Sequence, residues 1–145
     1  MIDGAANTIV AHWKLSGAAD NVPMAYDAVR QRLYVACRTP AMLIALNATT
    51  GAELARAPVG DGADDLFYDA ELGRVYVISG AGEIDTFTLD GDAHVASIGV
   101  THTVAGAKTA LFVPSESTIY LGVPGRGELP AAIRVYSTAI QKESQ

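Results

Sequence analysis

The chain has 145 residues, of which 50% are hydrophobic and 18% are charged, and its formal net charge is −6 at pH 7. Such a composition excludes a disordered chain and supplies enough apolar side chains for one buried core. The acidic balance, with Lys and Arg scattered rather than clustered, argues against nucleic acids as partners.

Cysteine usage and the N-terminus leave the compartment open. The single cysteine, Cys37, lies in an apolar run, so we expect a buried, inert thiol and no disulfide within the chain. Residues 1–4 lack the basic and apolar regions of a signal peptide. The apolar stretches stay short of the ~20 residues that a membrane-spanning helix needs, so we expect no membrane partner.

Strand-like segments follow one another along the chain, separated by Gly- and Pro-bearing turns. Residues 8–15 form the first predicted strand, and three similar units come after it. The units span residues 23–59, 66–100 and 109–137, and a polar tail covers 141–145. Helical periodicity is weak throughout, so the pattern predicts an all-β chain.

The three units are repeats of one another. Tyr34, Tyr76 and Tyr120 occupy the same position in each unit and are separated by 42 and then 44 residues. Each unit has a short strand, a polar turn, an apolar strand, a loop and a third strand, and the first two units add a fourth strand after a Gly-bearing turn. That period and that strand count are typical of β-propeller blades, so the sequence predicts three four-stranded blades.

The strand count indicates how a ring of blades would close. The third unit ends after its third strand, at about Ser137, whereas residues 8–15 resemble a fourth strand without the three that should precede it. Natural propellers hold 4 to 8 blades, and three alone would leave two apolar faces and one sheet edge bare. We therefore expect a homodimer that forms a six-bladed ring by exchange of the N-terminal strand. The alternatives are a piece of a longer propeller, or a second gene product that supplies the missing blades.

The repeated motifs also carry a resemblance. The segments Arg32-Leu33-Tyr34-Val35, Arg74-Val75-Tyr76-Val77 and Thr118-Ile119-Tyr120-Leu121, with the turn Asn47-Ala48-Thr49-Thr50-Gly51, resemble the bacterial YVTN-repeat β-propellers. The resemblance covers roughly residues 8–137 and implies the fold rather than an activity. It also implies a chain about twice this length that is often exported, and this chain departs from both expectations.

Ligands of propellers usually meet loops on one face near the axis, and we place the candidate ligand-binding residues there. The polar loop residues chosen are Arg38, Asp64, Asp65, His102, Lys108 and Arg126. His102 is predicted to be loop-borne, in contrast to His12 and His94 on outer strands. The expected interface residues are Ile9, Trp13, Ile133 and Tyr136.

Catalytic and metal-binding patterns are weak. Asp20, Asp64 and Glu83 could hold an axial cation through carboxylate oxygens, although aspartates in Gly-rich loops more often cap turn amides. The sequence contains no Gly-x-Ser-x-Gly elbow, and its three histidines show no metal-ligand spacing. We therefore expect a non-catalytic binding or scaffold propeller, without a cofactor, that presents its loop face to a small molecule, peptide or protein. The alternative is a metal-dependent hydrolase or lactonase-like propeller with an axial cation.

Overall fold

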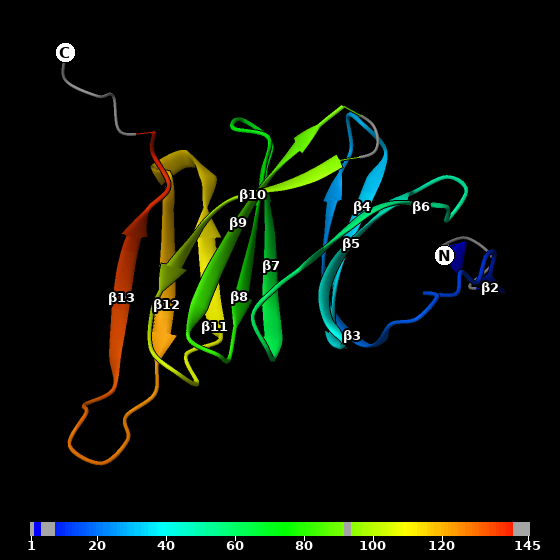
Figure 1. Ribbon diagram of the computed structural model, residues 1–145. Helices are drawn as coiled ribbons and strands as arrows, with labels where there is room; N and C mark the ends of the chain where they lie inside the picture. The colour runs from blue at the N-terminus through cyan, green and yellow to red at the C-terminus, as the bar shows by residue number, and fades with distance from the viewer. Residues whose placement is uncertain (1, 4–7, 92–93, 141–145) are drawn as a thin grey trace.

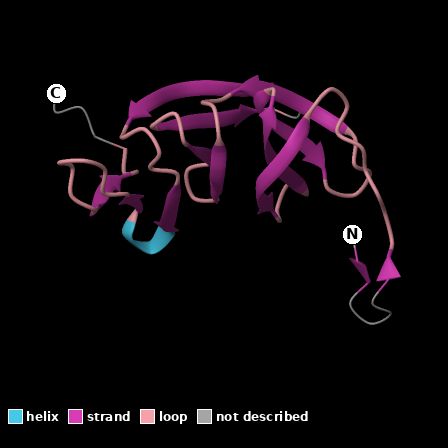
Figure 2. Cartoon of the chain, turned by 90° about the horizontal axis from the view of Figure 1, so that it is seen from below, coloured by secondary structure: helices cyan, strands magenta, loops and turns pink. Residues whose placement is uncertain are grey.

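The computed structural model describes residues 2–3, 8–91 and 94–140, and it is an all-β structure built from three antiparallel sheets of three or four strands and one two-stranded sheet. The sheets stand side by side in the order of the sequence (Figure 1). Seen at right angles, their strands form an arc (Figure 2). The prediction of an all-β chain is confirmed. Within the described ranges, no helix is long and apolar enough to span a membrane.

The first two sheets have four strands each. The first sheet consists of β3 (Ala19–Asp27), β4 (Arg32–Thr39), β5 (Ala41–Asn47) and β6 (Glu53–Pro58), in that spatial order. The second sheet consists of β7 (Ala63–Asp69), β8 (Arg74–Ser79), β9 (Glu83–Asp90) and β10 (His94–His102), also in sequence order. Each strand therefore pairs with its neighbour in the chain, as consecutive short hairpins predict.

The third sheet has three strands. It consists of β11 (Thr109–Val113), β12 (Thr118–Val123) and β13 (Ala132–Ser137), with a short 3₁₀ helix, η1 (Pro114–Glu116), between the first two. The other two strands, β1 (Ile2–Asp3) and β2 (Thr8–Ile9), pair with each other. The sequence predicted one strand over 8–15, and in this single chain only Thr8–Ile9 is extended and paired.

Polar turns end the first strand of each four-stranded sheet in the same way. The carboxylate of Asp27 accepts hydrogen bonds from the amides of Val29 and Arg30, each at 3.0 Å. Asp69, which is 42 residues later, accepts from Glu71 and Leu72, also at 3.0 Å. A short carboxylate that captures amides two and three residues ahead favours a turn over a longer strand. These two turns fix where the hairpins reverse.

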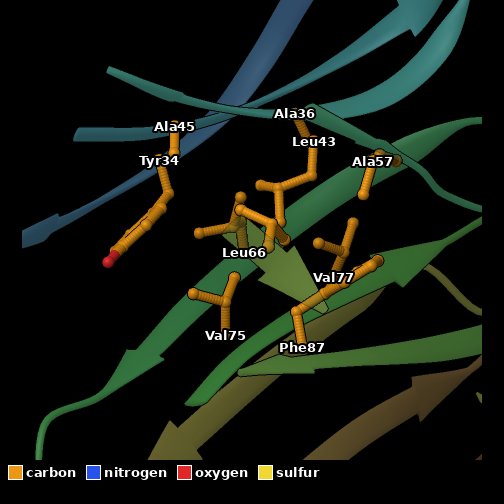
Figure 3. Packing of buried hydrophobic residues seen from close by; sticks show 11 residues of the cluster. Tyr34, Ala36, Leu43, Ala45, Ala57, Leu66, Val75, Val77 and Phe87 are labelled. Atoms are coloured by element: carbon orange, nitrogen blue, oxygen red, sulfur yellow. The ribbon is translucent and has the colours of Figure 1, made fainter. Parts of the chain in front are cut away.

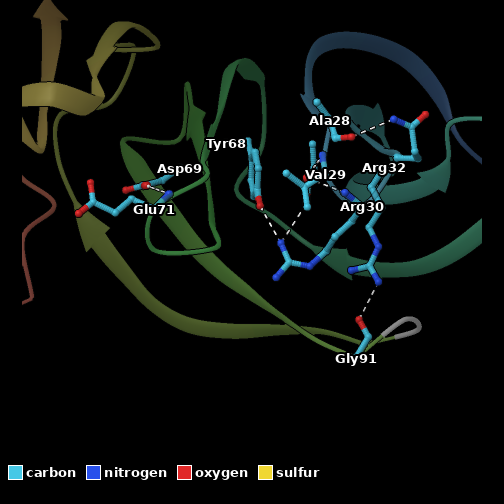
Figure 4. Close-up of polar contacts among 10 residues, drawn as sticks. Ala28, Val29, Arg30, Arg32, Tyr68, Asp69, Glu71 and Gly91 are labelled. Atoms are coloured by element: carbon cyan, nitrogen blue, oxygen red, sulfur yellow. Dashed lines mark hydrogen bonds and ion pairs between the residues drawn. The ribbon is translucent and has the colours of Figure 1, made fainter.

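Burial of Asp27 acts to raise its pKa, but hydrogen bonds from the Arg30 amide, Tyr68 and the Arg30 guanidinium outweigh it and lower the pKa. The same arginine also reaches the neighbouring sheet, because Arg30 Nη1 lies 3.0 Å from the Tyr68 hydroxyl (Figure 4). Arg32 Nη2 donates to the carbonyl of Gly91 at 2.8 Å (Figure 4). Polar contacts thus link the first and second sheets at this end.

Apolar side chains fill the space between successive sheets. Between the first and second sheets lie Tyr34, Leu43, Leu66, Val77 and Phe87, all buried (Figure 3). A second cluster, between the second and third sheets, is formed by Tyr76, Ile78, Ile84, Phe112, Ile119 and Leu121. Alternate residues of β4 and β8 point to opposite faces of their sheets, which is why both faces need apolar partners.

The outer face of the first sheet, on the side away from the second sheet, carries a third cluster. Val35, Cys37, Ile44 and Leu46 are buried there, and Leu15 and Ala18 pack against them. Cys37 is fully buried, and burial raises the pKa of its thiol. The expectation of a buried thiol at this position is confirmed.

Candidate functional site

Three loops, which join the first sheet to the second, β8 to β9, and the second sheet to the third, stack at one end of the molecule, which we call the loop end. They comprise residues 60–62, 80–82 and 103–108. The amide of Gly80 donates to the carbonyl of Gly62 at 2.9 Å, and the amide of Gly106 donates to the carbonyl of Gly80 at 2.8 Å. The backbone of each loop therefore supports the next, which gives polar side chains at this end a fixed base.

Three predicted ligand-binding residues meet at the loop end. Arg38, near the end of β4, donates from Nε to the carbonyl of Ala63 at 2.9 Å, and its guanidinium pairs with the Asp64 carboxylate. Lys108 Nζ lies 3.2 Å from the other oxygen of Asp64. One carboxylate of the second sheet thus binds a cation from the first sheet and a cation that leads into the third.

This trio remains accessible to a partner. The side chains of Arg38, Asp64 and Lys108 are 33%, 24% and 47% exposed. Two cations share one carboxylate, so each keeps donors that can bind an additional acceptor. The arrangement suits recognition by ion pairs and hydrogen bonds.

Asp65 and Arg126, two further predicted ligand-binding residues, lie nearby in different settings. Asp65 accepts a hydrogen bond from the amide of Ala110 at 2.6 Å and so ties β7 to β11, and burial raises the pKa of its carboxyl. The guanidinium of Arg126 lies against the Cα of Gly106, where a side chain would collide with it. Arg126 therefore belongs to the loop end, whereas Asp65 has a partner within the fold.

The sequence predicted that His102 lies in a loop, and this prediction is wrong. His102 is the last residue of β10, where it pairs with Glu83 of β9. Its side chain is 81% exposed, and its Nδ1 lies 3.6 Å from a Glu83 carboxylate oxygen. The physical reason for the difference is that the β9–β10 ladder continues to Glu83 and His102, after a bulge between Ser97 and Gly99.

The three candidate cation ligands stay apart. Asp20 accepts a hydrogen bond from Thr39 Oγ1 at 2.6 Å, Asp64 holds Arg38 and Lys108, and Glu83 faces His102. Among the residues that the structure describes, no three His, Cys, Asp or Glu side chains form a group that could hold a metal ion.

The four predicted interface residues occupy different surroundings. Ile9 and Ile133 are 77% and 67% exposed. Trp13 is half-buried, and its indole covers Gly51 in the turn between β5 and β6. Tyr136 packs against the cluster between the second and third sheets, so its side chain serves this chain's own core.

A buried acid that sequence reasoning missed lines a cavity between the first two sheets. The cavity has a volume of about 500 Å³ and is bordered by β6, β9 and β10. Asp85, only 6% exposed, accepts a hydrogen bond from the amide of Gly60 at 2.9 Å, and burial raises the pKa of its carboxyl. The signal was available, because Asp85 is in phase with the apolar Phe87 and Leu89 of the same strand.

Comparison with known proteins supports the fold. Neither the protein-family models nor the curated protein sequences give a match. Among solved structures, a proposed 6-phosphogluconolactonase from Bacteroides uniformis matches with a TM-score of 0.64 and 10% identity, over 86% of this chain and 38% of its own. A second, from Bacteroides fragilis, gives a TM-score of 0.64 and 12% identity, over 88% of this chain and 41% of its own.

The β-propeller domain of Cps50 (Swd1) from Myceliophteria thermophila is also similar. Its TM-score is 0.57 at 14% identity, over 81% of this chain and 43% of that domain. At such identities the likeness shows a fold shared with part of a β-propeller, and no activity. The chain spans about two fifths of the length of these structures.

Proposed function

We propose that the three sheets are successive blades of a YVTN-type propeller. Tyr34, Tyr76 and Tyr120 support this assignment, because each lies in the second strand of its sheet. Each also faces the equivalent residue of the first strand, namely Ala25, Phe67 and Leu111. Equal register in all three units is what a repeated blade requires.

We further propose that the protein is a non-catalytic binding or scaffold propeller whose loop end binds a peptide or protein. The observation that carries this proposal is the trio Arg38, Asp64 and Lys108, which links the first sheet, the second sheet and the loop that leads into the third, and which stays accessible. A small-molecule ligand is less well supported, because such ligands need concave sites. Two cavities of about 380 and 500 Å³ lie between sheets, and the trio lines neither of them.

A random peptide library displayed on phage tests the binding role. We expect peptides with acidic residues to be selected by the purified chain and to lose at least about tenfold in affinity for a variant with Arg38→Ala and Lys108→Ala. The matched control is Arg134→Ala, since Arg134 is an exposed cation on β13. Equal binding of the selected peptides to the loop-end variant would place the binding surface elsewhere.

The second candidate function is a lactonase-like hydrolase, favoured by the fold shared with two proposed 6-phosphogluconolactonases. Asp20, Asp64 and Glu83 would have to draw together around a cation, which requires Asp64 to leave its two cationic partners. Hydrolysis of 6-phosphogluconolactone by the purified chain, with calcium or zinc added, would establish this function. We expect no rate above that of buffer.

A further inference from the structure

One face of the third sheet is apolar and uncovered among the described residues. Leu111, Ile133 and Val135 on this face are 59%, 67% and 62% exposed. Tyr120 pairs with Leu111 of β11 and with Val135 of β13, so the side chains of Leu111, Tyr120 and Val135 lie on the same face of the sheet. The equivalents of Ile133 in the first and second sheets are Leu43 and Ile84, which are 0% and 3% exposed. A neighbouring sheet buries this position wherever one is present.

The first sheet has the opposite free face. Met24 and Tyr26 of β3 are 58% and 49% exposed there. Tyr26 pairs with Leu33, as Tyr68 pairs with Val75 and Phe112 pairs with Ile119. Tyr26, Tyr68 and Phe112 are therefore equivalent residues, of which only Tyr26 lacks a preceding sheet.

A repeated aromatic contact shows what each face is built to meet. Tyr34 of the first sheet packs on Tyr68 of the second, with ring centroids 5.5 Å apart. Tyr76 of the second sheet packs on Phe112 of the third, also at 5.5 Å. If the series continues, the ring of Tyr120 packs on the residue that is equivalent to Tyr68 and Phe112. That residue is Tyr26. The two free faces of the chain are thus complementary to each other.

The segment before β3 already lies where a preceding sheet would have its fourth strand. β6 leads into β7 and β10 leads into β11, so the outer strand of one sheet precedes the first strand of the next. Residues 11–18 precede β3 in the same way and lie over the outer half of the first sheet, with Arg56 Nη2 donating to the Ser16 carbonyl at 3.1 Å. Met24 and Tyr26 lie on β3, the strand at the other edge of the first sheet, and residues 11–18 leave their side chains uncovered. The uncovered part of the face has room for the three strands of another sheet.

We propose that two copies of the chain close a ring in which Tyr120 of each copy packs on Tyr26 of the other. The third sheet of each copy covers the free face of the other's first sheet, and residues 8–15 of the second copy pair with the open edge of β13. Both contacts are identical by the two-fold axis, and six blades make a ring of ordinary size. The inference rests on the proposed blade architecture and is independent of the binding role of the loop end.

A charge-exchange experiment tests the contact. By light scattering after gel filtration, we expect the unsubstituted chain at twice 15.1 kDa. Tyr26→Lys and Tyr120→Glu each introduce a charge into the buried contact and should weaken dimerisation by at least about tenfold. The chain that carries both substitutions places Lys opposite Glu at each interface and should recover dimer.

The control is Val29→Lys, because Val29 is 88% exposed in the β3–β4 turn and lies on neither face. Tyr26 is exposed, and Tyr120 is half-buried with its hydroxyl donating to the Glu116 carboxylate, so neither is a core residue of the single chain and circular dichroism should show that every variant folds. A monomeric unsubstituted chain, a larger assembly, or a dimer unaffected by Tyr120→Glu would each overturn the proposal. A monomer that still selects acidic peptides would leave the proposed binding function standing.

Strand exchange has its own test. Proline lacks the amide that pairs in a ladder, and neighbouring residues of a strand direct their amides to opposite sides. Of the variants Val10→Pro and Ala11→Pro, at least one should therefore weaken the dimer. If both keep the dimer at full affinity, residues 8–15 do not pair with β13.

Discussion

At the scale of single residues, Asp85 is a buried acid whose charged form the fold disfavours. Its carboxyl accepts a hydrogen bond from the Gly60 amide, and the same cavity is lined by Phe87, Val95 and Glu83. Burial removes the carboxyl from water and the nearby charge of Glu83 repels it, so ionisation is disfavoured relative to an unfolded chain in water. The raised pKa of Asp85 follows from that burial.

The raised pKa fixes the sign of a stability effect. The contribution of protonated Asp85 to stability is fully present below the ordinary pKa of 3.8 and is lost as the pH rises through the higher pKa of the folded chain. We therefore expect Asp85→Asn, which keeps an acceptor for Gly60, to raise the thermal unfolding midpoint at neutral pH. The gain should vanish below pH 3.8.

Thermal unfolding followed by circular dichroism at several pH values measures this effect. The exposed acid Asp61 provides the control, since Asp61→Asn should leave the midpoint nearly unchanged at every pH. A lower midpoint for Asp85→Asn at neutral pH would contradict the account of Asp85 as a destabilising buried charge.

At the scale of elements, the turns between strands hold neighbouring loops in place. Gly82, between β8 and β9, has a φ of +89°, and a Cβ there would lie 2.7 Å from the backbone nitrogen of Ala105. Its carbonyl accepts a hydrogen bond from the Thr103 amide at 2.7 Å. The turn at Gly82 therefore packs against the loop that carries Lys108 and is hydrogen-bonded to it.

Substitution of Gly82 distinguishes the cost of its positive φ from the cost of crowding the backbone of Ala105. Gly82→Ala should destabilise the chain by more than the ~1 kcal/mol that a left-handed residue costs, because the loop around Ala105 must also move. Gly73→Ala is the matched control, since Gly73 has a φ of +62° and open space around it. Urea unfolding of both variants measures the difference, and equal losses would contradict a role for the contact.

Much of the element scale could be predicted, because the repeat marks it. Tyr34, Tyr76 and Tyr120 located the second strand of each sheet, and the Gly-bearing turns located the hairpins. Strand ends were harder to predict: Asp20 lies in β3 and His102 in β10, although both were expected in loops. Ladder pairing extends a strand when a partner is available, and that depends on the neighbouring strand rather than on local residues.

The candidate site was predictable as a face but not as a set of contacts. Arg38, Asp64 and Lys108 were chosen because their loops should gather on one side. The sharing of Asp64 between two cations, and the pairing of Asp65 with the Ala110 amide, depend on how adjacent sheets are stacked. The repeat in the sequence predicts the strands of each sheet, but it does not predict which side chains of adjacent sheets come into contact.

At the scale of the whole molecule, three sheets in an arc leave exposed apolar side chains at both ends. In the proposed dimer, the face with Leu111, Tyr120 and Val135 packs on the partner's face with Met24 and Tyr26, because the two faces continue one repeating series. The position of Ile133 is exposed at the end of the arc, whereas its equivalents Leu43 and Ile84 between sheets are buried. A closed ring removes both exposed faces and the open edge of β13.

The mass of the unsubstituted chain by native mass spectrometry tests this account most directly. The account predicts a species at twice 15.1 kDa that persists on dilution, because each dimer contains two identical interfaces. A stable species at 15.1 kDa would contradict it and would mean that the two faces meet something other than a second copy.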